Sequence, residues 1–250
     1  PDLPEADNIY AATLYHADLR IGQLLDALDE MKISDNTLVI FSSDNGPARG
    51  SPNSPIALSY DSATGPGYGI GAAKGITAGR RAFKGALMEG GIGVPFIARW
   101  PGKIAAGKVD KTSVLSAVDL LPTFCELGNV KLPKSYKPDG MSQVPALMGK
   151  GNPLRKKPIF WRMSAPWPAS ESKPDHWVAY AVVHEQWKLV LNNDRSHAEL
   201  YDLVRDPLES SDLATKNLET VKRMKNLLQK WLSSIPAKPI GDVFSSLRES

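Results

Sequence analysis

Residues 38–47 read Leu-Val-Ile-Phe-Ser-Ser-Asp-Asn-Gly-Pro, an apolar run that ends abruptly at Asp44, Asn45 and Gly46. A short continuous apolar stretch bounded by turn residues is typical of a strand buried on both faces of a parallel sheet. In open α/β sheets, ligands bind outside the carboxyl ends of such strands. Asp44 and Asn45 therefore place a carboxylate and an amide oxygen where this class of fold carries out its chemistry. Calcium and magnesium prefer oxygen ligands of this kind.

A simpler interpretation of the same residues stays open. Asp-Asn-Gly is a common turn sequence, because these residues form local hydrogen bonds and tolerate unusual backbone angles. Two oxygen ligands are also too few for calcium, which takes about 6–8. The remaining ligands of a metal at Asp44 and Asn45 would come from substrate, water or other residues.

A second candidate site residue, Lys84, follows a segment over residues 47–83 that is rich in Gly, Pro, Ser and Ala. A structureless loop of this length is usually functional or disordered. Lys84 precedes Gly85, and glycine allows the backbone to approach a ligand closely. An ammonium group there would offset negative charge that develops on a reacting oxygen. We interpret Lys84 as a candidate catalytic residue, and an ordinary solvated lysine is the alternative.

The pattern of apolar residues divides the chain into two parts, residues 1–150 and 151–250. The first part is predicted to hold helices over 7–32 and 116–128 and strands over 37–42 and 94–100. The second part is predicted to hold short strands over 159–162, 177–183, 187–192 and 199–203, and a helix over 217–235. We expect an α/β fold with a partial, mostly parallel sheet and flanking helices. A small α+β subdomain follows, with an antiparallel four-stranded sheet covered by the C-terminal helix.

Composition and motifs exclude several classes of function. The formal charge of +3 is small and the basic residues are scattered, so nothing favours nucleic-acid binding. No apolar run approaches the roughly 18 residues of a membrane span. One cysteine, Cys125, excludes an internal disulfide, and its apolar helical surroundings indicate a packed, unreactive thiol. The four histidines show no H-x-x-x-H spacing, and the chain has no G-x-S-x-G elbow.

Seven stretches, in order along nearly the whole chain, resemble the sulfatase family of the alkaline-phosphatase superfamily. The resemblance is strongest to arylsulfatase A-like and N-acetylgalactosamine-6-sulfatase-like members. The stretches are Tyr10–Leu25, Phe41–Gly46, Lys84–Pro95, Trp100–Gly102, Asp119–Thr123, Trp187–Leu191 and Glu199–Pro207.

The resemblance implies that Asp44 and Asn45 match two ligands of the family's calcium ion, with calcium preferred to magnesium. It implies that Lys84 matches the family's active-site lysine. The implied activity is hydrolysis of a sulfate ester carried by a sugar or an aryl group. The family context also implies a periplasmic, lysosomal or extracellular location.

The chain departs from the family pattern at three points. The family's nucleophile is a formylglycine made from the first residue of C/S-x-P-x-R, and here Ser164-Ala-Pro-Trp-Pro168 has proline in place of the arginine. The early pair of Asp metal ligands is also missing. Since family order puts both elements before residue 1, we expect an N-terminally truncated sulfatase that is inactive alone. Gly93 stands where the family usually has Arg, which puts one ion pair in doubt.

Two rival functions stay open. One is a phosphoester hydrolase of the same superfamily, because a metal and a lysine do not by themselves distinguish sulfate from phosphate. Such phosphatases typically need two transition metals and many His and Asp ligands, and this chain has only four histidines. The other rival is a non-catalytic module, derived from a sulfatase, that binds a carbohydrate or another partner.

Overall fold

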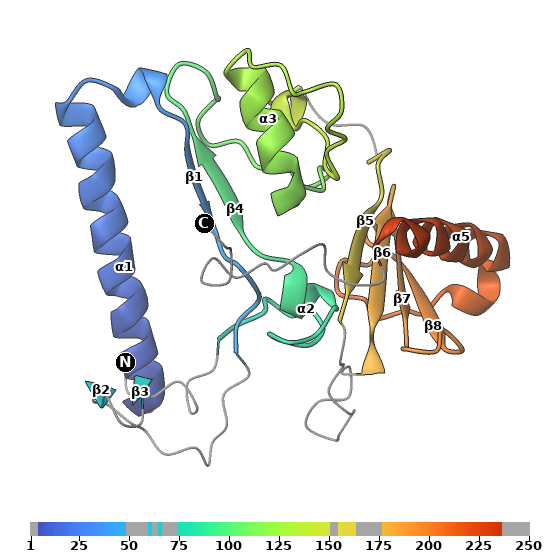
Figure 1. Cartoon of the computed structure of the whole chain (residues 1–250). Coiled ribbons are helices and arrows are strands. Elements are labelled where there is room, and N and C mark those ends of the chain that lie inside the picture. The colour runs from blue at the N-terminus through green and yellow to red at the C-terminus, as the bar shows by residue number, and fades with distance from the viewer. Residues whose placement is uncertain are drawn as a thin grey trace, which may run out of the picture.

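The computed structural model describes residues 5–48, 60–61, 65–66, 75–150, 155–163 and 177–236 (Figure 1). In the first part of the chain the helices are α1 (Glu5–Glu30), η1 (Ser34–Asn36), α2 (Glu89–Ile92), η2 (Ala117–Asp119), α3 (Leu120–Leu127) and α4 (Val144–Leu147). The strands there are β1 (Val39–Ser42), β2 (Tyr60–Asp61), β3 (Gly65–Pro66) and β4 (Phe96–Arg99). The helix predicted over 7–32 corresponds to α1, and the helix predicted over 116–128 corresponds to η2 and α3. The strands predicted over 37–42 and 94–100 correspond to β1 and β4.

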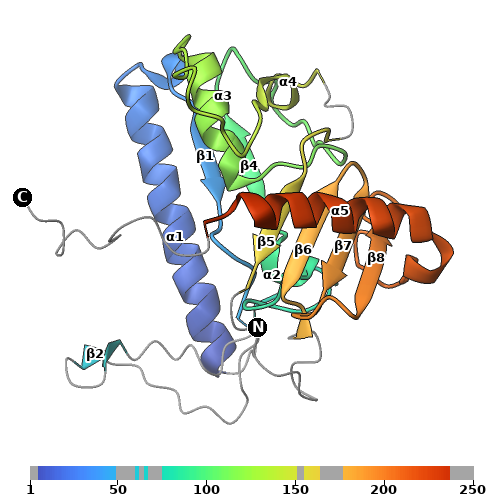
Figure 2. The ribbon, with the colours of Figure 1, turned by 45° about the vertical axis from the view of Figure 1, so that its right-hand side comes forward.

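The second part of the chain forms the predicted antiparallel meander. Its strands are β5 (Ile159–Arg162), β6 (Tyr180–His184), β7 (Trp187–Leu191) and β8 (Ala198–Asp202), and they pair in chain order. After the single turn η4 (Ala214–Lys216), the helix α5 (Leu218–Ser234) crosses one face of this sheet (Figure 2). The indole of Trp231 on α5 stacks on Phe160 of β5, with 4.9 Å between ring centroids. The expected four-stranded sheet and its covering helix are confirmed.

The four-stranded sheet has buried apolar residues on both faces. On one face, Leu189 and Leu191 of β7 pack with Met224 and Leu228 of α5. On the other face, residues of β6, β7 and β8 pack with Leu87, Met88 and Ile92, which belong to the segment around α2. Alternate residues of a strand point to opposite faces, which is why one strand serves both layers. The sheet therefore lies between α5 and the segment that carries Lys84 (Figure 1).

The strands of the first part differ from the prediction. β1 pairs with β4 in antiparallel register, with Val39 opposite Arg99 and Ser42 opposite Phe96, so the expected parallel pairing is not confirmed. The expected burial on both faces is wrong for this ribbon, because Phe41 is 44% exposed and Ile97 on β4 is 59% exposed. An apolar run predicts a strand but carries no information on the direction of its neighbour. In the described residues β1 pairs only with β4. Phe41 and Ile97 are opposite each other in the ribbon and share its exposed face, whereas Ile40 and Phe96 on the other face lie near residues of α3.

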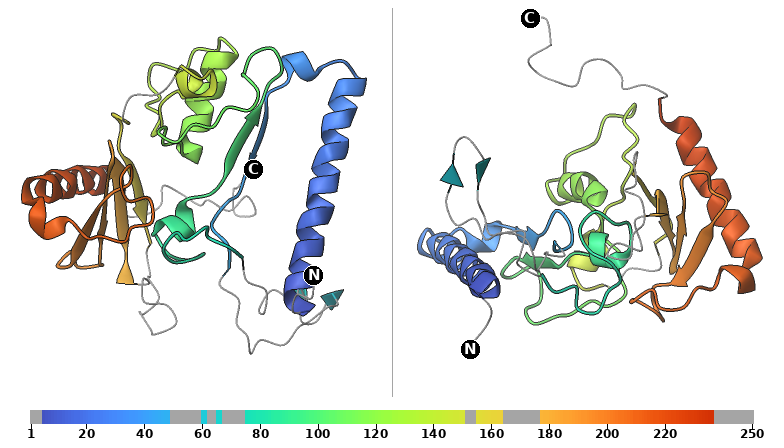
Figure 3. Two further views of the ribbon diagram at one scale, coloured as in Figure 1. Left: turned by 180° about the vertical axis from the view of Figure 1, so that it is seen from behind. Right: turned by 90° about the horizontal axis from the view of Figure 1, so that it is seen from below.

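The long helix α1 stands beside the β1–β4 ribbon rather than packing closely on it (Figure 3). Its apolar residues Leu14, Tyr15 and Leu24 are exposed among the described residues. Its C-terminal end is tied to β4, because Arg99 donates hydrogen bonds of 3.1 and 3.2 Å to the carboxylate of Asp29. The helix itself is confirmed.

A buried ion pair links the two parts of the chain. Both terminal nitrogens of Arg155 donate to the carboxylate of Asp119, each at 2.7 Å, and both side chains are almost fully buried. The same carboxylate accepts hydrogen bonds of 2.9 Å from the backbone N–H groups of Ser116 and Met141. This bond network crosses the expected boundary at residue 150, and that boundary stays a prediction.

Candidate active site

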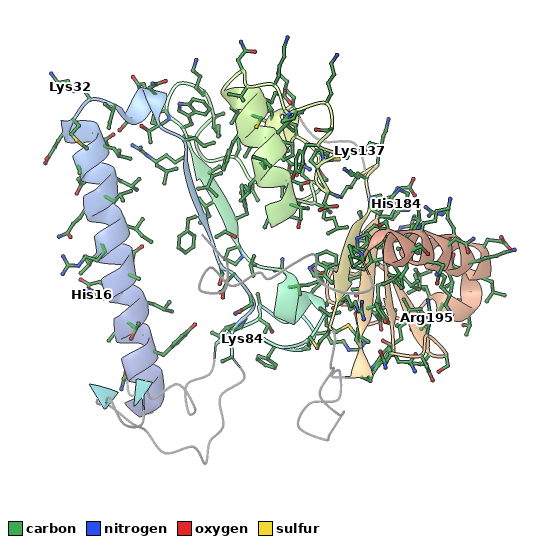
Figure 4. All side chains as sticks on the ribbon, viewed as in Figure 1. His16, Lys32, Lys84, Lys137, His184 and Arg195 are labelled. Atoms are coloured by element: carbon green, nitrogen blue, oxygen red, sulfur yellow. The ribbon has the colours of Figure 1, made fainter. Side chains whose placement is uncertain are left out.

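The segment that follows β1 lies beside the segment that carries Lys84. The backbone N–H of Gly46 donates to the carbonyl of Gly91 at 2.8 Å, and the N–H of Lys84 donates to the carbonyl of Pro47 at 2.9 Å. Figure 4 shows Lys84 close to the chain that leaves β1. These bonds bring the backbone of the Asp44–Asn45 turn next to that of the Lys84 loop, although Lys84 is distant from the turn in sequence.

Glycine is required for this close approach. A Cβ atom built on Gly46 would lie 1.9 Å from the carbonyl oxygen of Gly90, and one built on Gly90 would lie 2.1 Å from the carbonyl oxygen of Ala82. Gly46 and Gly90 are buried, so the backbones are packed directly against each other. The glycines of Asp-Asn-Gly and Glu-Gly-Gly therefore have a steric role.

Replacing Gly46 by Ala is expected to destabilise the protein by at least about 1–3 kcal/mol, because overpacking forces the backbone to move. The movement would separate the turn at Asp44 from the Lys84 segment. The matched control is Gly22→Ala in α1, where a new Cβ meets nothing within 4 Å. Alanine favours a helix interior by roughly 0.5–1 kcal/mol over glycine. Urea unfolding of both variants measures the difference, and equal midpoints would show that the contact at Gly46 is unimportant.

The side chains of the predicted site residues are available to a ligand. The Asp44 carboxylate is exposed, and no hydrogen bond or ion pair engages it within the described residues. The amide nitrogen of Asn45 donates to the carbonyl of Gly46 at 2.9 Å, which leaves its amide oxygen free to bind a cation. Lys84 is likewise exposed, and no described residue pairs with its ammonium group.

These oxygen atoms fit part of a calcium site. The described residues contain no group of three or more His, Cys, Asp or Glu side chains that could hold a metal by themselves. Asp44 and Asn45 thus offer two of the roughly 6–8 oxygen ligands that calcium takes. Their assignment as metal ligands, and that of Lys84 as a catalytic residue, stays a prediction.

Behind the Lys84 segment lies a buried charge cluster, made of Glu89, Lys188 and Glu209. The ammonium of Lys188 donates a hydrogen bond of 2.8 Å to the carboxylate of Glu89. It also lies 2.8 Å from a carboxylate oxygen of Glu209, but this second contact does not have hydrogen-bond geometry. The second carboxylate oxygen of Glu209 accepts the backbone N–H of Glu89 at 2.6 Å. The side chains of Lys188 and Glu209 are 0% exposed. Burial raises the pKa of Glu209, although the ammonium of Lys188 and the N–H of Glu89 act in the opposite direction.

A second polar cluster holds the start of the same segment. Arg81 donates to the carboxylate of Glu199 at 2.9 Å and to the hydroxyl of Tyr201 at 2.6 Å, and Tyr201 also donates to Glu199. Burial raises the pKa of the Tyr201 hydroxyl, and the neighbouring carboxylate of Glu199 acts in the same direction. In sequence, Lys84 therefore lies between two residues that are attached to the C-terminal part. Arg81 is bonded to β8, and Glu89 is bonded to β7 and to Glu209 in the loop after β8.

The sequence prediction assigned no role to Glu89, Lys188 or Glu209. A signal was present for Lys188, which is the one charged residue in the strand Trp-Lys-Leu-Val-Leu.

The glycine at position 93, where the family usually has Arg, is explained by its close neighbours. Arg80 donates to the carbonyl of Gly93 at 2.6 Å, and a Cβ at this position would lie 2.6 Å from a carboxylate oxygen of Glu89. Residues 164–168, with the incomplete nucleophile pattern, lie outside the described residues.

Comparison with known families matches nearly the whole described chain. The family model named Sulfatase matches residues 4–130, and the model named N-sulphoglucosamine sulphohydrolase, C-terminal, matches residues 82–236. The two matches overlap at the segment that carries Lys84. The chain belongs to the sulfatase family.

Individual relatives agree with this assignment. The chain is 30% identical over 227 residues to an N-acetylgalactosamine-6-O-sulfatase of Bacteroides thetaiotaomicron, covering 85% of this chain and 39% of the relative. It is 32% identical to human arylsulfatase A over 152 residues, covering 61% of this chain and 26% of the relative. The chain thus spans about two fifths or less of the length of these relatives.

Solved structures share the fold. The structure of Ps i-CgsB in complex with k-i-k-neocarrahexaose matches with a TM-score of 0.70 at 27% identity, covering 92% of this chain and 44% of that one. The structure of BT4656 with its substrate D-glucosamine-2-N,6-O-disulfate matches with a TM-score of 0.58 at 25% identity, covering 90% of this chain and 40% of that one.

Within the described residues, no helix has the length and apolar character needed to cross a bilayer.

Proposed function

We propose that this chain is the C-terminal part of the catalytic unit of a sulfatase that hydrolyses a sulfate ester on a sugar or an aryl group. The observation that carries the proposal is the pair of backbone hydrogen bonds that joins the Asp44–Asn45 turn to the Lys84 segment. Family membership and the sulfated sugar bound by BT4656 support this substrate class. By the same family context we propose a periplasmic, lysosomal or extracellular location.

In this proposal, Asp44 and Asn45 would hold calcium together with ligands from elsewhere. Calcium bound there would supply positive charge to polarise the sulfate oxygens and to favour ionisation of the attacking hydroxyl. The ammonium of Lys84 donates a hydrogen bond to the sulfate or to the bridging oxygen. It stabilises the negative charge that develops as the sulfur–oxygen bond to the alcohol breaks. The polar clusters beneath the Lys84 segment keep this loop in place.

The nucleophile is proposed to come from polypeptide that precedes residue 1 in the gene. Reading the frame upstream tests this directly, and a C/S-x-P-x-R motif there is the expected result. If an upstream reading frame lacks this motif, the sulfatase proposal fails and the non-catalytic binding module is favoured. The phosphoester hydrolase is tested by parallel assays of the full-length protein, in which an aryl sulfate should be cleaved and an aryl phosphate should not.

Removing calcium is expected to abolish hydrolysis of an aryl sulfate by the full-length protein, and adding calcium back should restore it. Binding of calcium should also raise stability, by about 2.7 kcal/mol at a hundred times its dissociation constant. In Asp44→Ala this stabilisation should be largely lost, because one charged ligand is removed.

The matched control is Asp139→Ala, at an exposed carboxylate in the connector after α3. Thermal unfolding with and without calcium measures the effect for wild type and both variants. The same calcium-dependent rise in Tm for wild type and Asp44→Ala would remove Asp44 from the metal site.

A further inference from the structure

We propose that Lys188, together with Glu89 and Glu209, is a positioning unit that holds the Lys84 segment against the Asp44–Asn45 turn. This inference rests on the proposed function, because it takes Lys84 as the group that touches substrate. Its consequence is that the C-terminal sheet sets the geometry of the reaction through its contacts with the Lys84 segment.

The first step is the direction of Lys188. On β7, Leu189 and Leu191 belong to the apolar layer under α5, while Val190 belongs to the layer that contacts Leu87 and Met88. Lys188 alternates with Leu189, so it shares the face of Val190. This is the face on which the segment around α2 lies (Figure 1). Lys188 is therefore a fully buried cation aimed from the sheet into the Lys84 segment.

The second step is the chain of contacts from Lys188 to the turn. Lys188 binds the carboxylate of Glu89, the first residue of α2, and Glu209 binds its backbone N–H. Two residues along, the carbonyl of Gly91 accepts the N–H of Gly46. Since both the side chain and the backbone of Glu89 are held, α2 has little freedom to rotate or shift. The position of Gly46 follows from that of α2.

The third step is the energetic consequence of losing the cation. Removing one partner of a buried charge pair leaves an uncompensated charge and strongly disfavours the original arrangement. Without Lys188, the carboxylates of Glu89 and Glu209 would face each other in a site where Glu209 is 0% exposed. They would have to move apart, and Glu89 would carry α2 and the Lys84 segment with it.

Stability alone does not account for a buried charge cluster. Replacing a buried ion pair by well-packed apolar residues is often neutral or stabilising, so a buried pair is weak evidence for a purely structural role. The α5-facing neighbours on the same strand, Leu189 and Leu191, show that this sheet packs with leucine. What the three charged groups add is a fixed direction for Glu89, which an apolar contact would not impose.

The test compares Lys188→Met with Arg155→Met in the full-length protein, using hydrolysis of an aryl sulfate. Both variants remove the cation of a buried pair, but Arg155 binds Asp119 and makes no described contact with residues 84–92. We expect Lys188→Met to lower kcat by about 10–100-fold with KM changed by less than about threefold. Arg155→Met should keep kcat of the folded protein within about threefold of wild type. Equal kcat values for wild type and folded Lys188→Met would overturn the proposal.

A double-mutant cycle with Lys84→Ala separates positioning from a general structural effect. If Lys188 acts through Lys84, adding Lys188→Met to Lys84→Ala should lower kcat by less than about threefold further. If it lowers kcat by the same factor as in wild type, Lys188 does not act through Lys84 and the proposal is wrong. If Lys84→Ala itself retains the wild-type rate, Lys84 is not the catalytic group and the inference fails while the sulfatase function stands. If the wild-type protein does not hydrolyse the aryl sulfate, the proposed function fails, and this result is distinct from the others.

Two further measurements keep the test decisive if Lys188→Met does not fold. Glu209→Gln preserves shape and removes one buried charge, so it should also lower kcat, and an unchanged kcat would count against the unit. Hydrogen exchange of the amides of Gly46 and Lys84, which bond to Gly91 and Pro47, should accelerate in Glu209→Gln. Exchange rates equal to wild type at both amides would contradict the proposed path.

Discussion

Replacing Lys84 by Ala is expected to lower the turnover of an aryl sulfate by the full-length protein by roughly a hundredfold or more. The expectation follows from the proposed role of Lys84 as a donor to developing charge, since donors of this kind contribute about 2.7–4 kcal/mol to transition-state stabilisation. Because the interaction strengthens as the sulfur–oxygen bond breaks, the loss should fall on kcat more than on KM. Steady-state kinetics over a range of substrate concentrations measure both.

Lys137→Ala is the matched control for this experiment. Lys137 is also an exposed lysine, and it lies beside α3, well away from Lys84 (Figure 4). Its loss should leave kcat and KM unchanged, which shows that general removal of positive charge is not the cause. A Lys84→Ala protein that turns over at nearly the wild-type rate would remove Lys84 from the mechanism.

Replacing Arg155 by Met is expected to lower the free energy of unfolding by about 3–5 kcal/mol. The reason is that Asp119 would remain as a buried carboxylate after losing both hydrogen bonds to the guanidinium. Denaturation by urea, read by circular dichroism, measures the change. This prediction concerns the fold alone and does not depend on the proposed activity.

The control for Arg155 is Arg205→Met. Arg205 forms an ion pair with Asp202 at 3.9 Å, but its side chain is 87% exposed. Exposed pairs contribute at most about 1 kcal/mol, so the midpoint should hardly move. Similar losses in the two variants would show that burial does not set the importance of these ion pairs.

The C-terminal meander was predictable because its strands alternate with strong turn signals. The turn at Glu185 and Gln186 separates two runs rich in Val, Leu and Trp, and β6 ends directly before it and β7 begins directly after it. The helix over 217–235 was predictable from its apolar face, and Met224 and Leu228 on that face are buried in the structure. Local patterns were sufficient here, because each strand pairs with its neighbour in sequence.

The β1–β4 ribbon was not predictable in the same way. Val39–Ser42 reads as a strand, but its partner lies more than fifty residues along the chain, at Phe96–Arg99. An apolar run contains no signal for the direction of a distant partner. The exposure of Phe41 depends on what else covers the ribbon, and that too lies outside the local sequence.

The candidate site shows the same division. Asp44, Asn45 and Lys84 were proposed from turn chemistry, loop composition and family resemblance, and their roles stay predictions. The buried cluster beneath Lys84 was missed, because Glu89 and Glu209 are 120 residues apart and nothing in the local sequence of Glu209 marks it as buried. Contacts of this kind arise from tertiary packing, which brings a loop glutamate under the Lys84 segment.

A crystal structure of the full-length protein with calcium and sulfate tests the central claim most directly. The account predicts a calcium ion with a carboxylate oxygen of Asp44 and the amide oxygen of Asn45 at about 2.3–2.6 Å. It also predicts the ammonium of Lys84 within hydrogen-bond distance of the sulfate, about 2.7–3.2 Å. A calcium ion bound elsewhere, or an Asp44 side chain turned away from Lys84 with sulfate present, would contradict it.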